Sequence, residues 1–114
     1  MDDISVLFDL LNERTRQTYE SAGLSRREGI YMFMNQFFEP VYIGRSYDLA
    51  GRLNNHRVML EPQMPDARFL VAKTTDESYE TEEILIQYHR PKYNGRGLTA
   101  RGGFGKQLET AKQN

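Results

Sequence analysis

One acidic side chain lies on a face of a predicted helix where apolar side chains gather. Residues from about 76 or 78 to 89 have helical periodicity, and Pro91 ends the pattern. The apolar arc of this helix consists of Ile84, Leu85, Ile86 and Tyr88. Glu82 falls inside the arc, between Leu85 and Ile86, and a carboxylate in that place needs a partner. A salt bridge to an arginine and a bound metal ion would both provide one, so both interpretations stay open.

Two tyrosines lie on neighbouring strands of a predicted β-hairpin. Residues 29–34 and 41–45 are rich in aromatic and branched side chains, and a polar loop joins them. The predicted cross-strand pairs are Met34 with Val41, Phe33 with Tyr42 and Tyr31 with Gly44. In this register Tyr31 and Tyr42 lie on the same side of the hairpin, and Gly44 leaves a gap opposite Tyr31.

An arginine and a histidine share one face of the helix that follows the hairpin. We predict this helix to run from a cap at Ser46 or Asp48 to about residue 59. Arg52 and His56 are four residues apart, so their side chains lie on the same face. Gly51 within the helix indicates a close approach of the backbone or a tolerated weakness, because glycine costs about 1 kcal/mol relative to alanine there.

Composition excludes several other kinds of site. The chain of 114 residues has no cysteine and two histidines, which excludes disulfides, thiolate zinc sites, a cysteine nucleophile and a multi-histidine metal site. The formal net charge is −1, so overall basicity cannot indicate a nucleic acid. From Ile84 onward, however, six basic residues stand against one acidic residue, which favours a polyanion-binding end. No segment resembles a membrane span or a secretory signal, and we expect a soluble, cytoplasmic chain without a membrane partner.

The remaining elements frame these candidates. Ile4, Leu7, Phe8 and Leu11 have the spacing of an apolar helical stripe. We therefore predict a helix over residues 3–21, either a dimerisation or specificity face or a helix docked on its own domain. A third strand is predicted at 68–72. The predicted organisation is an N-terminal helical extension at 1–28, a central domain at 29–94 and a Gly-rich basic tail at 95–114.

These motifs together resemble the GIY-YIG nuclease family. Gly29-Ile30-Tyr31 and Tyr42-Ile43-Gly44 match the two tripeptides that name the family. Arg52 lies where the family has its invariant arginine, and His56 where many members carry His or Tyr. Glu82 precedes Leu85-Ile86 and then Pro91-Lys92-Tyr93-Asn94, which is similar to the closing segment of the family. The match covers residues 29–94, just over half of the chain.

The resemblance implies a small α+β domain, with a three-stranded sheet that begins with a hairpin and is flanked by helices. It also implies a DNA endonuclease that hydrolyses a phosphodiester bond with one divalent ion, Mg2+ or Mn2+, and leaves 5′-phosphate and 3′-hydroxyl ends. DNA is the implied partner. Carried over to this sequence, the resemblance makes Glu82 the metal ligand.

The other implied roles suit the chemistry of a phosphodiester. Tyr31 and Tyr42 would position and activate the attacking water, with His56 assisting a tyrosine. Arg52 would hold the scissile phosphate, since a guanidinium is a forked donor that stays charged. A tyrosine is a poor base at neutral pH unless its pKa is lowered. Either a neighbouring cation, metal ion or imidazole helps the tyrosine to lose its proton, or the tyrosine only orients the water. The sequence leaves both alternatives open.

Several basic or polar residues are expected to contact DNA. Family members often have lysine, a proposed proton acceptor, where this chain has Arg45. Because arginine does not lose its proton in proteins, we expect Arg45 to contact phosphate instead. Asn94 is expected as a structural or phosphate contact at the rim. Arg96, Arg101 and Lys106 in the Gly-rich tail suit a DNA backbone, although a tail without a ligand has the same composition.

The biological role has more than one interpretation. The chain shows little room for a specificity domain, so we expect specificity to come from the N-terminal helix and the Gly-rich tail, from loops such as 61–66, or from a specificity partner. A homodimer is a further possible assembly, because cutting both strands needs more than one encounter. One active site cuts one strand, so a monomer should nick. Members of the family include repair nucleases, restriction enzymes, intron-homing enzymes and resolvases of branched DNA. Among these roles we favour a compact nuclease of a phage or mobile element that nicks DNA, and a homing, restriction or repair role stays open. The alternative is a DNA-binding or regulatory module that keeps the fold without cutting.

Overall fold

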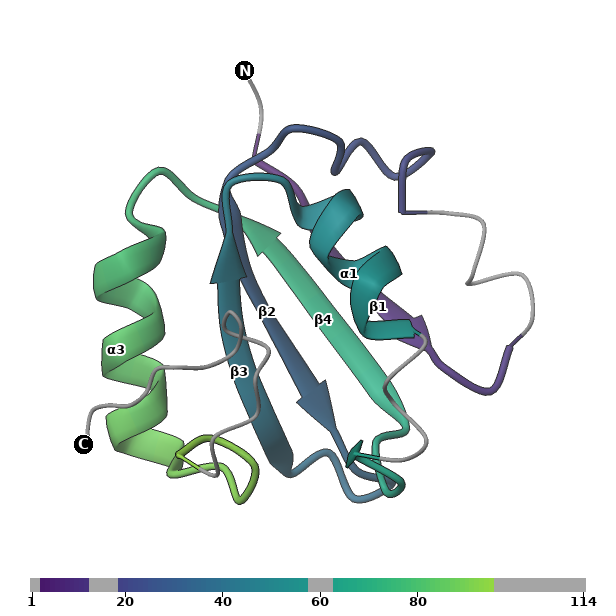
Figure 1. The fold of residues 1–114 in the computed structure, drawn as a ribbon, viewed down its shortest axis with the longest axis vertical. Coiled ribbons are helices and arrows are strands. Elements are labelled where there is room, and N and C mark those ends of the chain that lie inside the picture. The colour runs from purple at the N-terminus through teal and green to yellow at the C-terminus, as the bar shows by residue number, and fades with distance from the viewer. Residues whose placement is uncertain (1–2, 13–18, 58–62, 96–114) are drawn as a thin grey trace.

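The fold is a single antiparallel sheet, and one helix lies on each side of the edge strand formed by residues 40–46. The computed structural model describes residues 3–12, 19–57 and 63–95. Its elements are β1 (Ser5–Asp9), β2 (Gly29–Met34), β3 (Pro40–Ser46), α1 (Leu49–Arg57), β4 (Phe69–Thr74) and α3 (Ser78–His89). The strands are ordered β1-β4-β2-β3 (Figure 1). The small α+β class is confirmed, but the sheet has four strands where three were predicted.

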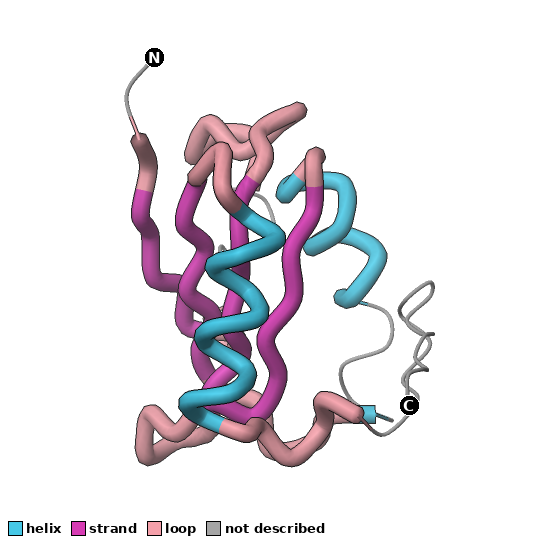
Figure 2. The backbone as a smooth tube through the Cα atoms, turned by 90° about the vertical axis from the view of Figure 1, so that its left-hand side faces the viewer, coloured by secondary structure: helices cyan, strands magenta, loops and turns pink. Residues whose placement is uncertain are grey.

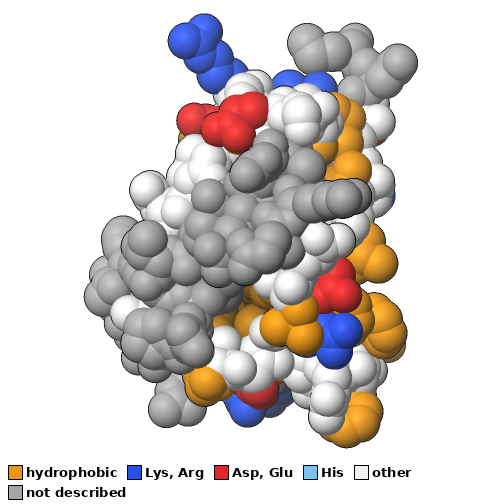
Figure 3. All heavy atoms as spheres, turned by 90° about the vertical axis from the view of Figure 1, so that its right-hand side faces the viewer, with side chains coloured by type: hydrophobic (Ala, Val, Ile, Leu, Met, Phe, Trp, Pro, Cys, Tyr) orange, Lys and Arg blue, Asp and Glu red, His pale blue; other side chains and the backbone are white. Residues whose placement is uncertain are grey.

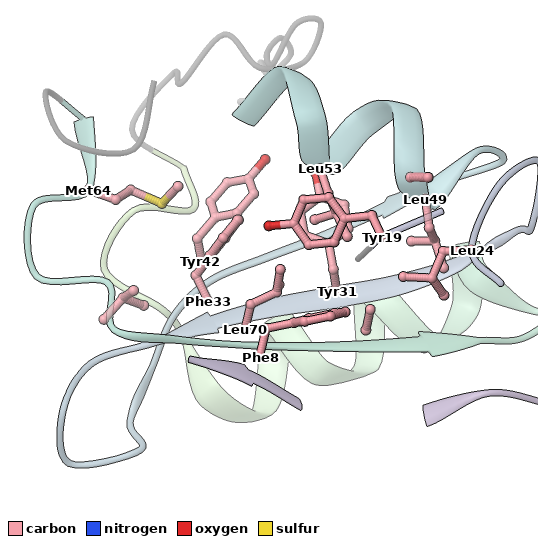
Figure 4. Close-up of a cluster of buried hydrophobic side chains, with 13 residues drawn as sticks. Phe8, Tyr19, Leu24, Tyr31, Phe33, Tyr42, Leu49, Leu53, Met64 and Leu70 are labelled. Atoms are coloured by element: carbon pink, nitrogen blue, oxygen red, sulfur yellow. The ribbon is translucent and has the colours of Figure 1, made fainter. Parts of the chain in front are cut away.

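The predicted hairpin register is confirmed where it positions the tyrosines. Tyr31 pairs with Gly44 and Phe33 with Tyr42. The rings of Tyr31, Phe33 and Tyr42 therefore stand on the same side of the sheet, where they pack in one buried cluster with α1 residues such as Leu49 (Figure 4). Alternation along the strands thus places two phenol groups under α1.

The last pair of the hairpin differs from the prediction. The register shifts after Phe33, and Met34 pairs with Pro40 rather than with Val41. Such a bulge places one extra residue in one strand and turns it away from its partner. Here the backbone carbonyl of Val41 accepts a hydrogen bond of 2.9 Å from the Tyr93 amide, so the bulge ties the chain after α3 to β3.

The start of α1 is capped by Asp48, one of the two predicted caps. Its carboxylate accepts a hydrogen bond of 3.2 Å from the Gly51 amide and one of 2.9 Å from the Arg26 amide. A Cβ atom on Gly51 would lie 2.6 Å from the Asp48 carboxylate, which explains the glycine inside this helix. The predicted helix end near residue 59 lies outside the described residues.

The N-terminal helix prediction is wrong for the residues that the structure describes there. Ser5–Asp9 form strand β1, which pairs with β4 at the edge of the sheet. Phe8 is buried, whereas Leu7 is 57 % exposed. A helical stripe would have buried both. Residues 13–18 of the predicted helix lie outside the described part.

The apolar residues of the same segment also alternate with a period of two, which is typical of a strand. Ile4, Val6 and Phe8 alternate with residues that face outward, and Ile4 and Val6 pack against the core cluster. Short apolar segments fit helical and strand periodicity alike. The open edge of β4 decides between them, because pairing with β1 satisfies its backbone groups. Residues 5–9 of the predicted N-terminal extension are thus a strand of the sheet and not part of a helix.

The helix α3 buries a narrower face than the sequence predicts. Its bounds, Ser78–His89, agree with the prediction, and Arg90 ends it with a left-handed φ of 47°. Ile84 and Tyr88 are 65 % and 80 % exposed, so their assignment to the buried arc is wrong. The reason is that α3 packs mainly along a single strand, β3. In Figure 2, α1 and α3 lie on opposite sides of β3.

The surface of the described residues shows no large basic area on the face drawn in Figure 3. Lys and Arg side chains are scattered there among acidic and apolar groups. Within the described ranges, no helix has the length and apolar character needed to span a bilayer. The described side chains on this face therefore form no continuous basic surface for an anionic ligand.

Candidate active site

A polar hollow of about 610 Å³ opens beside the edge strand β3. Its lining residues come from two strands, two helices and the turn before α1: Tyr31, Tyr42, Gly44, Arg45, Ser46, Tyr47, Asp48, Arg52, Tyr79 and Glu82. We call it the edge hollow. The fold thus brings together four of the five predicted catalytic residues, Tyr31, Tyr42, Arg52 and Glu82. Arg45, a predicted phosphate contact, lines the same hollow.

The two tyrosines meet at the base of the edge hollow because Gly44 makes room for one of them. A Cβ atom on Gly44 would lie 2.5 Å from Cζ of Tyr31, so the phenol ring occupies the gap that the glycine leaves. The ring centroids of Tyr31 and Tyr42 are 6.2 Å apart, with an angle of 37° between the planes. The cross-strand glycine is therefore needed to seat the first tyrosine.

The Tyr31 hydroxyl holds its proton tightly. Burial raises the pKa of Tyr31 well above its ordinary value, and the charges of Tyr42 and Glu82 and a hydrogen bond with Tyr42 act in the same direction. The positive charge of Arg52 lowers that pKa, but by less than burial raises it. At neutral pH Tyr31 is therefore a neutral hydrogen-bonding group.

Arg52 lines the edge hollow from the first turns of α1. Its backbone amide donates a hydrogen bond of 3.0 Å to the Asp48 carbonyl, so the capped helix start sets the position of Arg52. His56 lies one turn further along α1, but the described part of the chain does not include its side chain. The predicted role of His56 stays a prediction.

Glu82 has an arginine partner, and its surroundings also suit a metal ion. Nε of Arg45 lies 3.6 Å from Oε1 of Glu82, and the two side chains are 29 % and 22 % exposed. No group of three or more His, Cys, Asp or Glu among the described residues could hold a metal. Mg2+ needs no such cage, since it takes oxygen ligands and keeps several waters on one or two carboxylates. One partly exposed carboxylate in a hollow with tyrosine hydroxyls fits that requirement.

The sequence interpretation missed two tyrosines at the mouth of the edge hollow. Tyr47 follows β3 directly, and Tyr79 is in the first turn of α3. The guanidinium carbon of Arg45 lies 5.6 Å from the ring centroid of Tyr47 and 5.2 Å from that of Tyr79. The spacing carried a signal for one of them, since Tyr79 and Glu82 are three residues apart and share a helix side.

Asn94 has a structural partner in the backbone of β3. Its side-chain oxygen accepts a hydrogen bond of 2.9 Å from the Ile43 amide, and its side-chain nitrogen donates one of 2.8 Å to the Ile43 carbonyl. This geometry favours the structural of its two predicted roles. The other predicted DNA contacts, Arg96, Arg101 and Lys106, lie outside the described residues.

Comparison with solved structures identifies a domain with the same fold. The GIY-YIG N-terminal endonuclease domain of UvrC from Thermotoga maritima, bound to its catalytic magnesium ion, is 30 % identical with a TM-score of 0.56. The alignment covers 73 % of this chain and 98 % of that domain. A point variant of the same domain, also bound to its catalytic divalent cation, is 29 % identical with the same TM-score.

Comparison with curated sequences also finds UvrC proteins. The UvrABC system protein C of Francisella philomiragia is 29 % identical over 82 residues, which are 64 % of this chain. The corresponding protein of Francisella tularensis subsp. novicida is 28 % identical over the same length. This chain spans 13 % of the length of these relatives. No protein-family model matches the chain.

The fold and the edge hollow define a small endonuclease domain whose polar residues gather beside an edge strand. The chain belongs to the GIY-YIG endonuclease family.

Proposed function

We propose that this chain is a Mg2+-dependent endonuclease that hydrolyses a phosphodiester bond of DNA in the edge hollow. One observation carries the proposal. Tyr31, Tyr42, Arg52 and Glu82 come from four different elements and line one hollow. The solved UvrC domain, which binds a catalytic magnesium ion, supports the choice of metal.

In this mechanism Arg52 binds a non-bridging oxygen of the scissile phosphate and offsets the charge that builds up there. Glu82 would hold the ion, which supplies positive charge beside the phosphate and lowers the pKa of bound water. Arg45 must leave Glu82, and its guanidinium can then contact the DNA backbone.

The tyrosines orient the attacking water. The raised pKa of Tyr31 supports a role as a neutral hydrogen-bond donor rather than as a base. Tyr42, which is 8 % exposed and lines the same hollow, would share this task. Removal of the water proton falls to another group, and the sequence leaves Tyr42 and His56 open for this role.

We further propose that a monomer nicks one strand, because one site of this composition cuts one bond at a time. The setting in a phage or mobile element stays a hypothesis from the sequence. The rival function is a module of the same fold that binds DNA without cutting, and the presence of Tyr31, Tyr42, Arg52 and Glu82 in the edge hollow argues against it.

A plasmid-nicking assay separates the two functions. Wild type should nick supercoiled DNA with Mg2+ and fail with EDTA, while Glu82→Gln should be about a hundredfold slower or worse with Mg2+. Glu83→Gln is the matched control, since Glu83 is exposed on the same helix and does not line the edge hollow. A wild type without metal-dependent nicking would favour the binding module, and full activity of Glu82→Gln would remove Glu82 from the site.

A further inference from the structure

Two exposed aromatic rings stand at the mouth of the edge hollow. Tyr47 is 68 % exposed and Tyr79 55 % exposed, so neither ring is part of the core. They come from the turn before α1 and from the first turn of α3, two segments more than thirty residues apart in the chain. The fold brings them to the same opening as Arg52 and Glu82.

The cation beside these rings defines the chemistry of the opening. The Arg45 guanidinium lies within 6 Å of both ring centroids, the range of a cation–π contact. Arg45 also touches Glu82 deeper in the edge hollow. Proteins that bind unpaired nucleic acid stack its bases on aromatic rings and hold its backbone with basic groups. The opening offers both, because the two tyrosine rings and the Arg45 guanidinium lie beside Arg52, which binds phosphate in the proposed mechanism.

We propose that Tyr47 and Tyr79 form a stacking platform for the base of a nucleotide next to the scissile phosphate. The proposal rests on the proposed function and names the substrate class of the same site. In an intact duplex the faces of a base are covered by its neighbours, and exposing them costs free energy. The enzyme should therefore prefer DNA with unpaired bases near the cut, as in single strands, bubbles and branches, over perfect duplex.

A different role for the two residues is a hydrogen bond from each phenol hydroxyl to a phosphate. The two roles depend on different parts of the side chain. Tyr79→Phe keeps the ring and removes the hydroxyl, whereas Tyr79→Ala removes both. Tyr88→Ala is the matched control, because Tyr88 is an exposed tyrosine of the same helix that does not line the edge hollow.

Binding is measured in EDTA, so that cleavage plays no part. The probes are a single strand of about 20 nucleotides that contains 2-aminopurine and the same strand paired in a duplex, at one fixed salt concentration. Fluorescence anisotropy gives the dissociation constants, and quenching of 2-aminopurine reports stacking on an aromatic ring. Because neither readout needs catalysis, a failure of the nuclease proposal in the nicking assay is recognised separately.

Wild type, Tyr79→Phe and Tyr88→Ala should bind the single strand more tightly than the duplex and quench 2-aminopurine. Tyr79→Ala and Tyr47→Ala should weaken single-strand binding by about fivefold to about a hundredfold, with little change for the duplex. Equal losses in Tyr79→Phe and Tyr79→Ala would overturn the proposal in favour of a phosphate contact. Equal wild-type affinity for both probes, or binding without quenching, would overturn it as well.

Discussion

Tyr31 lies almost fully buried between the sheet and α1, with its hydroxyl directed to the base of the edge hollow. Burial raises the pKa of this hydroxyl by more than the positive charge of Arg52 lowers it, so the hydroxyl stays neutral at neutral pH. A neutral phenol can hold a water molecule in place and can contribute no negative charge beside the phosphate. At the level of the residue, the site thus combines two cationic side chains suited to phosphate, Arg45 and Arg52, with a hydroxyl that keeps its proton.

The raised pKa of Tyr31 has a consequence for stability at alkaline pH. Above about pH 10 the unfolded chain loses this proton, while the folded chain keeps it. The unfolded state then binds fewer protons, so the free energy of unfolding falls as pH rises, by at most about 1.4 kcal/mol per pH unit. The stabilisation is complete below that pH and is lost as pH rises through the pKa of the folded state.

Tyr31→Phe should therefore lose less stability than wild type between about pH 9 and about pH 11. Urea unfolding at several pH values gives the free energies. Tyr88→Phe, at an exposed position, is the control and should follow wild type. Parallel pH profiles for wild type and Tyr31→Phe would show that the Tyr31 hydroxyl does not hold its proton more tightly in the folded chain.

Among the elements, β1 contributes stability without reaching the edge hollow. It pairs with β4, on the side of the sheet away from β3. Its inward side chain Phe8 makes an edge-to-face contact with Tyr19, with the ring centroids 5.1 Å apart. Asp9 adds an ion pair with Arg68 at 3.1 Å, which is partly exposed and of small energetic value.

Phe8→Ala and Leu7→Ala distinguish the strand from the predicted helix. In the strand Phe8 is buried and Leu7 is exposed, so Phe8→Ala should cost about 3–5 kcal/mol and Leu7→Ala less than about 0.5 kcal/mol. Urea unfolding at neutral pH measures both. Folded Phe8→Ala should nick DNA at the wild-type rate. Similar losses of stability in the two variants would be the result expected of an apolar helical stripe.

For the whole molecule, the position of the edge hollow decides how DNA can approach. The hollow lies beside β3, between α1 and α3, where the sheet ends. A strand of DNA can therefore lie at the opening, where Arg52 and Glu82 are partly exposed, without entering the core. The described residues contain one hollow with this set of side chains. Cleavage of both strands then requires a dimer, a second encounter or sequential nicks.

In a plasmid time course, nicked circles should accumulate first, and linear DNA should form only later, from nicked circles. The reason is that one site hydrolyses one strand per encounter. Sedimentation at the assay concentration, with and without DNA, should show a monomer. Linear DNA that forms together with nicked circles, in a dimeric complex, would contradict a monomeric nickase.

Sequence patterns predicted the parts of the site whose residues are near one another in the chain. The pairing of Tyr31 with Gly44 follows from alternation along one hairpin. The Asp48 cap lies three residues from Gly51. Glu82 was noticeable because a carboxylate interrupts an apolar arc. In each case a local period or a short spacing contains the geometry, so a single sequence is sufficient.

Contacts between distant segments were decided by the tertiary structure alone. The Ile4 amide donates to Oγ1 of Thr74, which is seventy residues away, and this pairing makes a strand of a segment that also fits a helix. The narrow contact of α3 with β3 exposes Ile84 and Tyr88. The same packing brings Arg45 to Glu82 and Tyr47 near Tyr79.

The chain alone therefore predicted the candidate residues for the chemistry, and it determined which strand pair and helix start present them, because those relations depend on local backbone geometry. Three other features were decided only on folding: which edge of the sheet was open, which side of α3 was covered, and which aromatic rings reached the mouth of the edge hollow. These outcomes depend on packing between segments that are distant in the chain, and local periodicity cannot identify which of those segments will pair.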